Sequence, residues 1–561
     1  MKKRNSKSLV LISSASFTLL ASACSTISTT EPSKTSMAPT ESATTIKKVD
    51  PFGKYDPPIE VTAVRSVGAS VKYNPGEDLD NNVWTKEFLN TLGIKIKYTW
   101  TAPDAQYQQK LNLSIASGEI ADITAVNTTQ LKQMEESGQL EDLTGLYEQY
   151  AAPFTKEIIN QDGGLALKSA TFKGKLLALP YTAGSLGDVL WIRMDWLKKL
   201  NLPEPKTMDD VLKISEAFFA KDPDGNGKND TLGIAANKQI FEDMGSLRGF
   251  FNGYHAYPGA WIKDASGKVV SGSIQPEIKP VLAKLRDLYK AGQIDKEFPV
   301  KDGGKAVESV IAGKYGIMFG SDWFPYYPFV DGKTKDPNME WKAFAIPSID
   351  DKPAKVTVAF PVSKYFVVKK GSKHPEAAIK LLNLFCEKEW GKTADIEKYS
   401  VAKDGIELFK YPLVQTWPAL KDIPDTYLAL KDALETKDPK KLNAEQKAGY
   451  DKILGFMSGD SGINLINWAT MRQKAPTDSS YAVEYNYKKE NLLMVNAFYG
   501  APTPTMKEKS STLDKMTLEE FTKIIMGVVP VDDFDNFVTQ WKKLGGDDIT
   551  NEVNVWAETQ K

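Results

Sequence analysis

The residues with the clearest potential for chemistry lie in an acidic, glycine-rich loop at residues 222–231 of this 561-residue chain. Oxygen-bearing side chains occupy alternate positions there, and Gly227 allows a sharp turn between them. EF-hand-type loops bind Ca²⁺ with six to eight oxygens supplied from such alternating positions. We therefore predict a fixed structural calcium ion. Its predicted ligands are the side chains of Asp222, Asp224, Asn226 and Asp230 and the backbone carbonyl of Lys228.

The match to a calcium loop is incomplete at its last position. Gly233 stands where such loops carry a bidentate Glu. Asp, Asn and Gly also form turns that hold no metal, because their side chains bond to nearby backbone groups. A metal-free turn is therefore the alternative interpretation of the same residues.

A helix is expected to lead into this loop. Thr207 and Asp210 form an approximate capping box, with the carboxylate in the positively polarised first turn. Val211, Ile214 and Phe218 then recur at helical spacing, which predicts one buried face.

The N-terminus has the pattern of an export signal. Basic residues precede a short apolar run at 9–20, and small residues precede Cys24. This resembles a bacterial lipobox, in which Cys24 carries lipid such as palmitate, although Leu20 stands four rather than three positions before the cysteine. We expect a signal peptide at 1–23 and a Ser/Thr/Pro-rich disordered tether at 24–50. The alternative is an ordinary secretion signal with an incidental cysteine.

Composition argues against several classes of protein. Loss of four basic residues with the signal changes the formal charge from -1 to -5, and no basic run suited to nucleic acid follows. Cys386 is the only other cysteine, so the mature chain has no intramolecular disulfide available. No second apolar run approaches transmembrane length, and 42% hydrophobic residues can supply a large core.

Strand and helix patterns alternate along the first 400 residues. Predicted strands are followed by predicted helices at the spacing of an α/β fold with a largely parallel sheet. Beyond about residue 405 the pattern becomes mostly helical. The predicted strands are 59–64, 94–100, 120–126, 315–319 and 365–368, and the clearest helices are 105–117 and 278–289.

Several stretches together resemble the extracellular solute-binding lipoproteins of bacterial sugar ABC importers, in the larger Gram-positive branch. Each motif is moderately specific, and their order makes the combination strong. The resemblance rests on Cys24, Leu179–Tyr181, Leu190–Leu197, Pro205–Thr207, Asp222–Lys228, Lys373–Ala378, Gly500–Thr505 and Trp541–Gly546.

This resemblance implies a two-lobed, type II periplasmic-binding-protein fold with an interlobe hinge and a mostly helical C-terminal part. Lobe 1 is expected at 51–181 plus about 356–405, and lobe 2 at 182–355 plus about 406–561. The protein would be a monomer on the outer face of the membrane, held by its lipid. It would deliver a sugar to separate ABC permease subunits and bind no nucleic acid.

Sugar recognition needs flat aromatic faces and nearby polar groups. Any one aromatic residue can equally be part of the core, and Arg193 with Asp195 can equally be a structural ion pair. The favoured candidate is Trp323, because a Gly-Ser-Asp-Trp turn after a strand can direct its side chain into a cleft. The predicted ligand-binding residues are Trp323, Asp322, Trp191, Arg193, Tyr181, Trp261 and, more weakly, Trp100.

The sequence offers little for catalysis. It has two histidines, His255 and His374, and none of the common hydrolase or metalloprotease motifs. We therefore predict a binding protein with no enzymatic activity. Two alternatives stay open: a secreted glycoside hydrolase or lyase, whose paired carboxylates need not be close in sequence, and a surface adhesion lipoprotein.

Overall fold

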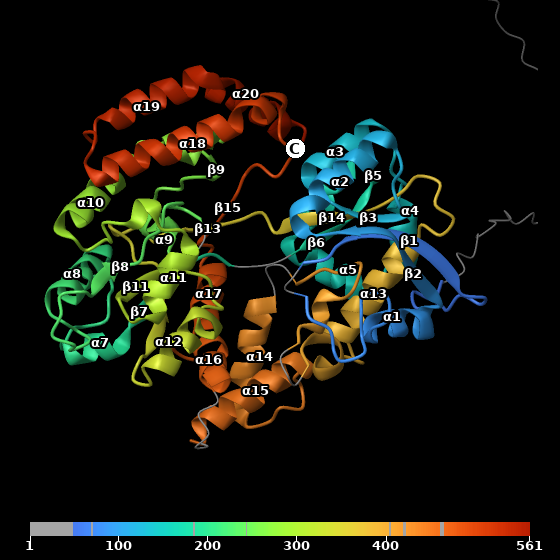
Figure 1. Cartoon of the computed structure of the whole chain (residues 1–561), viewed down its shortest axis with the longest axis horizontal. Helices are drawn as coiled ribbons and strands as arrows, with labels where there is room; N and C mark the ends of the chain where they lie inside the picture. Colours follow the sequence, from blue (N-terminus) through green and yellow to red (C-terminus); the bar gives the residue numbers. More distant parts are fainter. Residues whose placement is uncertain are drawn as a thin grey trace, which may run out of the picture. The chain divides into compact units, whose positions relative to one another are not determined.

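The computed structural model describes residues 49–68, 71–182, 186–242, 244–402, 406–418, 422–459 and 465–560. The signal peptide, Cys24 and nearly all of the expected tether lie outside these residues. Helices and strands alternate through most of the described chain, and Figure 1 shows two separate sheets, each with helices packed against it.

The first sheet has five strands in the order β2-β1-β3-β14-β6. β1 pairs in parallel with β2 and β3, whereas β14 runs antiparallel to both β3 and β6. The carboxyl ends of β1, β2, β3 and β6 therefore lie at the same edge as the amino end of β14. The strands are β1 (Ile59–Ser66), β2 (Ile94–Ala102), β3 (Ile123–Val126), β6 (Ala178–Thr182) and β14 (Val362–Val368).

Helices from both ends of the lobe's sequence cover this sheet. Their apolar faces and the sheet share one core, which also includes residues 408–414, beyond the expected lobe boundary at 405. A short hairpin, β4 (Thr171–Phe172) and β5 (Lys175–Leu176), precedes β6. The helices are α1 (Val83–Glu87), α2 (Asp104–Ser117), α3 (Thr128–Glu136), α4 (Thr144–Tyr150), α5 (Pro153–Ile159), α6 (Leu165–Ser169) and α13 (Ala377–Trp390).

The second sheet has four strands in the order β12-β7-β11-β8. β7 is antiparallel to β11 and β12, and β8 is parallel to β11. The carboxyl ends of β8, β11 and β12 thus share an edge with the amino end of β7. These strands are β7 (Val189–Arg193), β8 (Leu232–Ile234), β11 (Tyr315–Gly320) and β12 (Trp341–Phe344).

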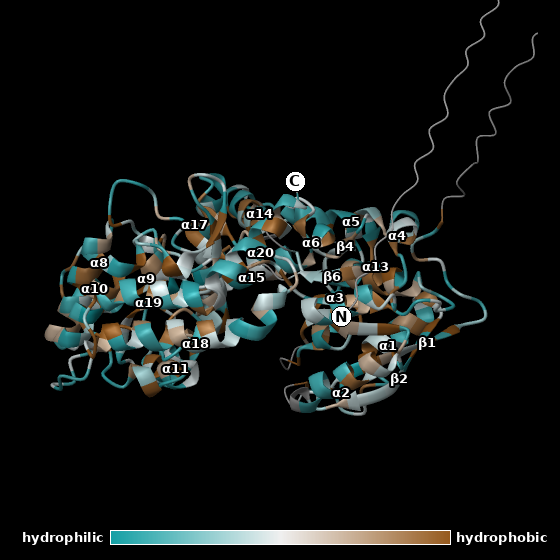
Figure 2. Cartoon of the chain, turned by 90° about the horizontal axis from the view of Figure 1, so that it is seen from above, coloured by the Kyte–Doolittle hydropathy of each residue, from teal (hydrophilic) through white to brown (hydrophobic). Residues whose placement is uncertain are grey.

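The second sheet and the C-terminal helices share the second core. α10 packs against the long helix α18, and Figure 2 shows that α18 has both hydrophilic and hydrophobic stretches. The helices of this lobe before the return to the first sheet are α7 (Met194–Lys199), α8 (Met208–Ala220), α9 (Arg248–Gly253), α10 (Ile278–Ala291), α11 (Gly303–Ile311) and α12 (Val330–Lys335).

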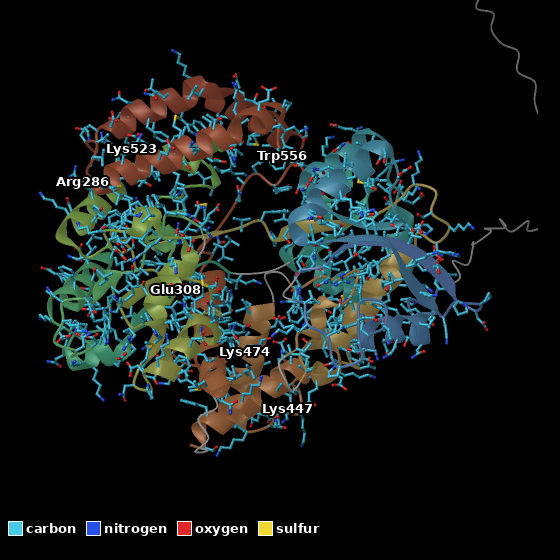
Figure 3. All side chains as sticks on the ribbon, in the orientation of Figure 1. Arg286, Glu308, Lys447, Lys474, Lys523 and Trp556 are labelled. Carbon is cyan, nitrogen blue, oxygen red and sulfur yellow. The ribbon has the colours of Figure 1, made fainter. Side chains whose placement is uncertain are left out.

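The C-terminal part is mostly helical, as predicted. α15 and α16 are joined by the ion pair between Lys474 and Glu445, whose Nζ–Oε1 distance is 2.6 Å. Figure 3 labels Lys474 among the side chains. Within the described residues, no helix is both long and apolar enough to cross a membrane. The helices are α14 (Asp422–Thr436), α15 (Ala444–Met457), α16 (Leu465–Lys474), α17 (Ser480–Lys489), α18 (Pro504–Met526), α19 (Asp533–Trp541) and α20 (Asp547–Glu558).

Two segments join the strands of the two sheets, and a third leads from the first core, after residue 414, to the C-terminal helices of the second core. The first runs from β6 to β7, and the second runs from β12 through β13 (Val356–Val358) to β14. β13 pairs with β15 (Leu493–Val495), so part of the C-terminal region accompanies the second crossing. Beside the first crossing, the backbone N–H of Thr182 donates to Thr416 Oγ1 at 3.2 Å, and that of Trp417 donates to the Thr182 carbonyl at 3.0 Å.

Candidate ligand-binding site

The helix before the acidic loop forms as predicted. In α8, the Thr207 hydroxyl accepts a hydrogen bond from the Asp210 backbone N–H, and the Asp210 carboxylate accepts one from the Thr207 N–H. Val211, Ile214 and Phe218 are buried on one face. The capping box and the apolar spacing are therefore both confirmed, and the acidic loop follows directly from the end of this helix.

The acidic loop folds around the Asp222 carboxylate. This group accepts hydrogen bonds from the backbone N–H groups of Gly225, Asn226 and Gly227 at 3.0–3.2 Å. The Asn226 side-chain amide donates to Asp224 at 2.7 Å and to Asp230 at 3.0 Å. The predicted side-chain ligands thus gather at one place. Within the described chain, however, no group of three or more His, Cys, Asp or Glu side chains is arranged to hold a metal.

Like charges meet in this loop. The neighbouring Asp224 carboxyl group and the backbone N–H donors of the loop lower the pKa of Asp222. Burial and the neighbouring Asp222 raise the pKa of Asp224. A divalent cation would relieve this repulsion, so the donor set fits Ca²⁺ chemically. The expected Glu has no room at position 233, since a Cβ on Gly233 would lie 2.0 Å from Ser215 Oγ.

A pocket of about 620 Å³ opens at the carboxyl ends of β1 and β3, and we name it the β1–β3 pocket. Tyr181 lines it from the end of β6 and is partly buried. Amide side chains and aromatic rings also line it, including Gln108, Asn127, Tyr107 and Phe409. Flat rings beside amides suit a ligand with both C–H and hydroxyl faces.

Lys364 enters the β1–β3 pocket from the start of β14. Its Nζ lies 4.2 Å from the centre of the Tyr181 ring and 5.6 Å from that of Phe366. Burial lowers the pKa of Lys364 to about 8, and the positive charge of Arg65 adds to the effect. Burial raises the pKa of Tyr181.

A second pocket lies at the corresponding edge of the other sheet, where β11 ends and β7 begins. This Trp323 pocket has a volume of about 280 Å³ and is lined by Asp188, Arg248, Trp323 and Phe324 among others. The Trp323 side chain is 41% exposed and packs edge-on against Phe324 with ring centres 5.2 Å apart. Trp323 therefore lies at a pocket edge and outside the core.

Asp322, the neighbour of Trp323, points into the protein. Its carboxylate accepts a hydrogen bond from Gln473 Nε2 at 2.7 Å, and only 6% of the residue is exposed. Burial raises the pKa of Asp322, and burial raises that of Glu484 well above its usual value. Asp322 thus connects the turn after β11 to α16 by a hydrogen bond, and little of its surface is accessible to a ligand.

Trp191 and Arg193 lie in the core of the second lobe. Trp191 is 0% exposed and donates from its indole N–H to the Ser321 carbonyl at 3.1 Å. Arg193 is 1% exposed and donates to both Asp195 carboxylate oxygens, at 2.8 and 2.5 Å. The ion-pair interpretation of Arg193 and Asp195 is confirmed. Neither Trp191 nor Arg193 lines the pockets described above.

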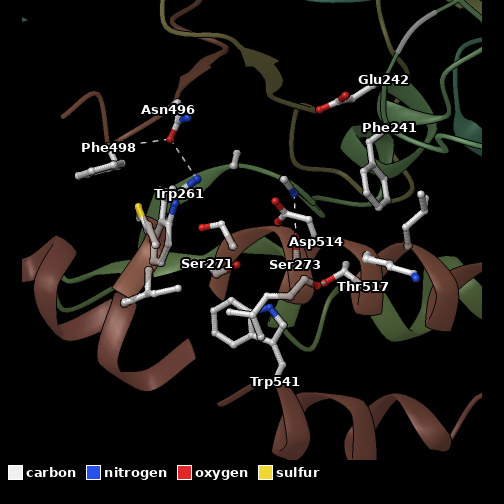
Figure 4. A pocket seen from close by; sticks show the side chains of 18 of the residues that line it. Phe241, Glu242, Trp261, Ser271, Ser273, Asn496, Phe498, Asp514, Thr517 and Trp541 are labelled. Carbon is white, nitrogen blue, oxygen red and sulfur yellow. Dashed lines mark hydrogen bonds between the residues drawn. The ribbon is translucent and has the colours of Figure 1, made fainter. Parts of the chain in front are cut away.

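Trp261 lines a third pocket, between the hairpin β9 (Trp261–Lys263) and β10 (Val269–Ser271) and helix α18. This Trp261 pocket has a volume of about 620 Å³ (Figure 4). Asn496 Oδ1 accepts hydrogen bonds from the backbone N–H groups of Trp261 at 3.1 Å and Phe498 at 3.3 Å. Trp100 lines none of these three pockets; it lies on edge strand β2, with Lys110 Nζ 4.7 Å from its ring centre and the Tyr107 ring centre 5.5 Å away.

The histidines lie away from these pockets. His255 Nε2 lies 3.0 Å from Asp350 Oδ1 and 3.2 Å from Ser348 Oγ, so both partners contact the same ring nitrogen. A hydrolytic triad needs the acid and the nucleophile on opposite ring nitrogens. His374 packs edge-on against Tyr55 and lies 3.6 Å from Glu376.

Sequence reasoning missed Arg65 and Lys364. Both are cationic residues inside strands, Arg65 near the end of β1 and Lys364 near the start of β14, and these two ends meet in the β1–β3 pocket. The sequence did contain a signal for these residues, namely a charged residue within a predicted strand. Such a residue must lie near a strand end or have a partner, because a charged side chain is rarely buried alone.

Comparison with known proteins defines the class. A family model described as "Bacterial extracellular solute-binding protein" matches residues 77–392, which is more than half of the chain. The chain therefore belongs to this family of extracellular binding proteins.

Two relatives from Bacillus subtilis (strain 168) align over most of their length. Lipoprotein LipO is 24% identical over 493 residues, which cover 87% of this chain and 91% of LipO. The polygalacturonan/rhamnogalacturonan-binding protein YtcQ is 23% identical over 479 residues, covering 83% of this chain and 86% of YtcQ.

Solved structures show the same fold. A human-milk-oligosaccharide (HMO)-binding solute-binding protein from Bifidobacterium longum infantis has a TM-score of 0.61 at 17% identity, with 89% of this chain and 99% of that chain covered. The alginate-binding protein AlgQ2, solved without calcium ion, has a TM-score of 0.58 at 17% identity, and the match covers 90% of this chain and 99% of AlgQ2. An EF-hand mutant of Streptococcus pneumoniae FusA in complex with fructo-nystose has a TM-score of 0.59 at 17% identity, with the same coverage. The two-lobed periplasmic-binding-protein fold inferred from the sequence is confirmed.

Proposed function

We propose that this protein captures an oligosaccharide between its two lobes and delivers it to the permease subunits of an ABC importer. One observation carries the proposal: each sheet has a pocket at the edge where the first crossing segment leaves or enters it. Thr182 and Asp188 are six residues apart, so they lie within about 20 Å of each other whatever path the chain takes. In open α/β sheets, ligands bind outside the carboxyl ends of strands.

The chemistry of the two pockets supports a carbohydrate ligand. Tyr181 and Trp323 offer aromatic surface, and the amides of Gln108 and Asn127 offer hydrogen bonds to hydroxyl groups. YtcQ, FusA and the Bifidobacterium protein are each named or described with a carbohydrate ligand. These likenesses support the same ligand class for this chain.

The experiment is calorimetry with a panel of neutral and acidic oligosaccharides, followed by chromatography of the mixture after prolonged incubation. We expect one-to-one binding and recovery of the oligosaccharide unchanged. Shortened products would instead indicate the glycoside hydrolase or lyase, and binding of long polymers without binding of short ones would indicate an adhesin.

We also propose that the acidic loop holds a structural Ca²⁺. The side chains of Asp222, Asp224, Asn226 and Asp230 and the carbonyl of Lys228 would supply the oxygens. When bound, the ion would neutralise the crowded carboxylates and fix the loop between α8 and β8. Titration of the EDTA-treated protein with Ca²⁺, followed by melting temperature, tests this.

Finally, we propose that lipid on Cys24 anchors the protein at the outer face of the cell membrane as a monomer. The family's extracellular location and the lipoprotein name of LipO support this. Cys24→Ala is expected to release the protein into the medium, and unchanged retention by membranes would exclude the anchor. Sedimentation of the purified protein tests for the monomer.

A further inference from the structure

We propose that the ligand is an acidic oligosaccharide, and that Lys364 and Arg65 of the β1–β3 pocket bind one of its uronate carboxylates. This inference rests on the proposed carbohydrate-binding function and narrows its substrate class. It also assigns the carboxylate-bearing sugar unit to the pocket of the first lobe.

The charged residues that line the β1–β3 pocket are all cations: Arg65, Lys364 and Lys410. Lys410 is neutralised by an ion pair with Glu407. The Arg65 guanidinium donates to the backbone carbonyls of Lys410 and Tyr411, which carry no charge. Within the part of the chain that the structure describes, neither Arg65 nor Lys364 forms an ion pair with a carboxylate. The positive charges of Arg65 and Lys364 therefore lie in the same pocket, and no carboxylate of the described residues forms an ion pair with either.

Lys364 is held over aromatic rings. Its ammonium lies above Tyr181 at 4.2 Å and within 5.6 Å of the Phe366 ring centre. Burial and the nearby Arg65 lower its pKa to about 8, so the charged form is less stable here than in an ordinary exposed lysine. A buried cation without a counter-charge is costly. A carboxylate entering the pocket removes that cost, which makes the pocket complementary to an anion.

The rest of the pocket fits a sugar better than a small free anion. Its volume of about 620 Å³ lies within the range of sites for small organic ligands. Rings from Tyr107 and Phe409 and amides from Asn127 and Gln415 line it. These groups can contact the C–H faces and hydroxyl groups of a pyranose while the two cations hold its carboxylate.

The surplus of positive charge is specific to this pocket. In the Trp323 pocket, the cationic Arg248 is accompanied by an acidic residue, Asp188. The Trp261 pocket is lined by two acids, Glu242 and Asp514, and one lysine, Lys515. Of the three pockets, the β1–β3 pocket alone is lined by cationic and aromatic residues and by no acidic residue.

The experiment uses pairs of ligands that differ in charge and by one methyl group on each carboxyl. The purified protein is titrated by calorimetry with tri-galacturonate and with its fully methyl-esterified form, and in parallel with alginate trimers and their esters. The variants are Lys364→Met, which removes the charge and keeps the chain length, and Lys364→Arg, which keeps the charge. The control is Lys95→Met, which removes one positive charge from an exposed position of β2 in the same lobe.

We expect at least one acid to bind about tenfold or more tightly than its ester, since a charge-assisted hydrogen bond contributes this much. The preference should disappear in Lys364→Met and persist in Lys364→Arg and Lys95→Met. Equal binding of acids and esters, or binding of neutral oligosaccharides alone, would overturn the acidic class and leave carbohydrate binding intact. An acid preference that persists in Lys364→Met would overturn the role of Lys364. If no oligosaccharide binds, both this inference and the proposed function are wrong. Should Lys364→Met not fold, the comparison of acid with ester on the unmodified protein still decides the ligand class.

Discussion

At the scale of single residues, two tryptophans that were both candidate ligand contacts have different environments. Trp323 is 41% exposed at a pocket edge, whereas Trp191 is fully buried. We expect Trp323→Ala to weaken oligosaccharide binding by about 1–3 kcal/mol, as in other sites where a ring stacks on an aromatic face. It should leave stability nearly unchanged. Trp191→Ala should cost about 3–5 kcal/mol of stability because it leaves a cavity.

Urea unfolding and calorimetry on both variants separate these outcomes. If Trp323→Ala unfolds readily while its folded fraction binds normally, Trp323 belongs to the packing of the lobe and not to the site. If Trp191→Ala is as stable as the parent protein, the core position of Trp191 is wrong.

Lys364 gives the site a pH dependence. Its charged form predominates below its pKa of about 8, so affinity for an acidic oligosaccharide should be constant below that pH and fall above it. Binding near pH 8.5 should take up protons, because the ligand carboxylate raises the pKa of the ammonium. Calorimetry in buffers of different ionisation enthalpy measures this uptake. Affinity that is unchanged from pH 7 to 9.5 would argue against Lys364.

The same shift has a consequence for stability of the free protein. Between pH 8 and the ordinary lysine range, the unfolded chain binds the proton that folded Lys364 has lost, so the contribution of this group to stability rises with pH. The other charged or titratable groups that face Lys364 are Arg65 from β1, Tyr107 from α2, Tyr181 from β6, and Lys410, which is paired with Glu407. The pKa values of Tyr107 and Tyr181 are raised, so these tyrosines do not add to the change in stability in this pH range.

At the scale of elements, the acidic loop is the most direct subject for a test. Ca²⁺ that binds only the folded state should raise the melting temperature, and EDTA should lower it. Asp224→Ala should remove this response because it takes one carboxylate from the cluster. Asp264→Ala is the matched control, since Asp264 also accepts hydrogen bonds in a turn, from Ser266 and Lys268. A melting curve unaffected by EDTA and Ca²⁺ would leave the loop as a metal-free turn.

Elements with strong local signals could be predicted from the sequence. The capping box at Thr207 and the glycine after α10 mark helix ends, and both depend only on neighbouring residues.

The candidate site was harder to predict. Trp191 lies in a continuous apolar strand buried on both faces, and the aromatic ring alone does not distinguish core from cleft. Lys364 acquires its role only when β14 returns beside β6, nearly two hundred residues away in sequence.

At the scale of the whole molecule, the two sheets have separate cores, joined by two segments between the sheets and a third that leads to the C-terminal helices of the second core. A ligand that contacts both lobes stabilises the state in which they are close, so binding and closure are linked. Because of this coupling, the importer would meet a closed protein when the ligand is bound and an open protein when it is absent.

Small-angle X-ray scattering tests this central claim most directly. The protein is measured alone, with a saturating oligosaccharide that binds in calorimetry, and with a member of the same panel that does not bind. We expect the radius of gyration to fall only with the bound oligosaccharide, approaching the value of about 24 Å for a compact chain of this size. An unchanged radius of gyration with the binding oligosaccharide at saturation would contradict capture by closure of the two lobes.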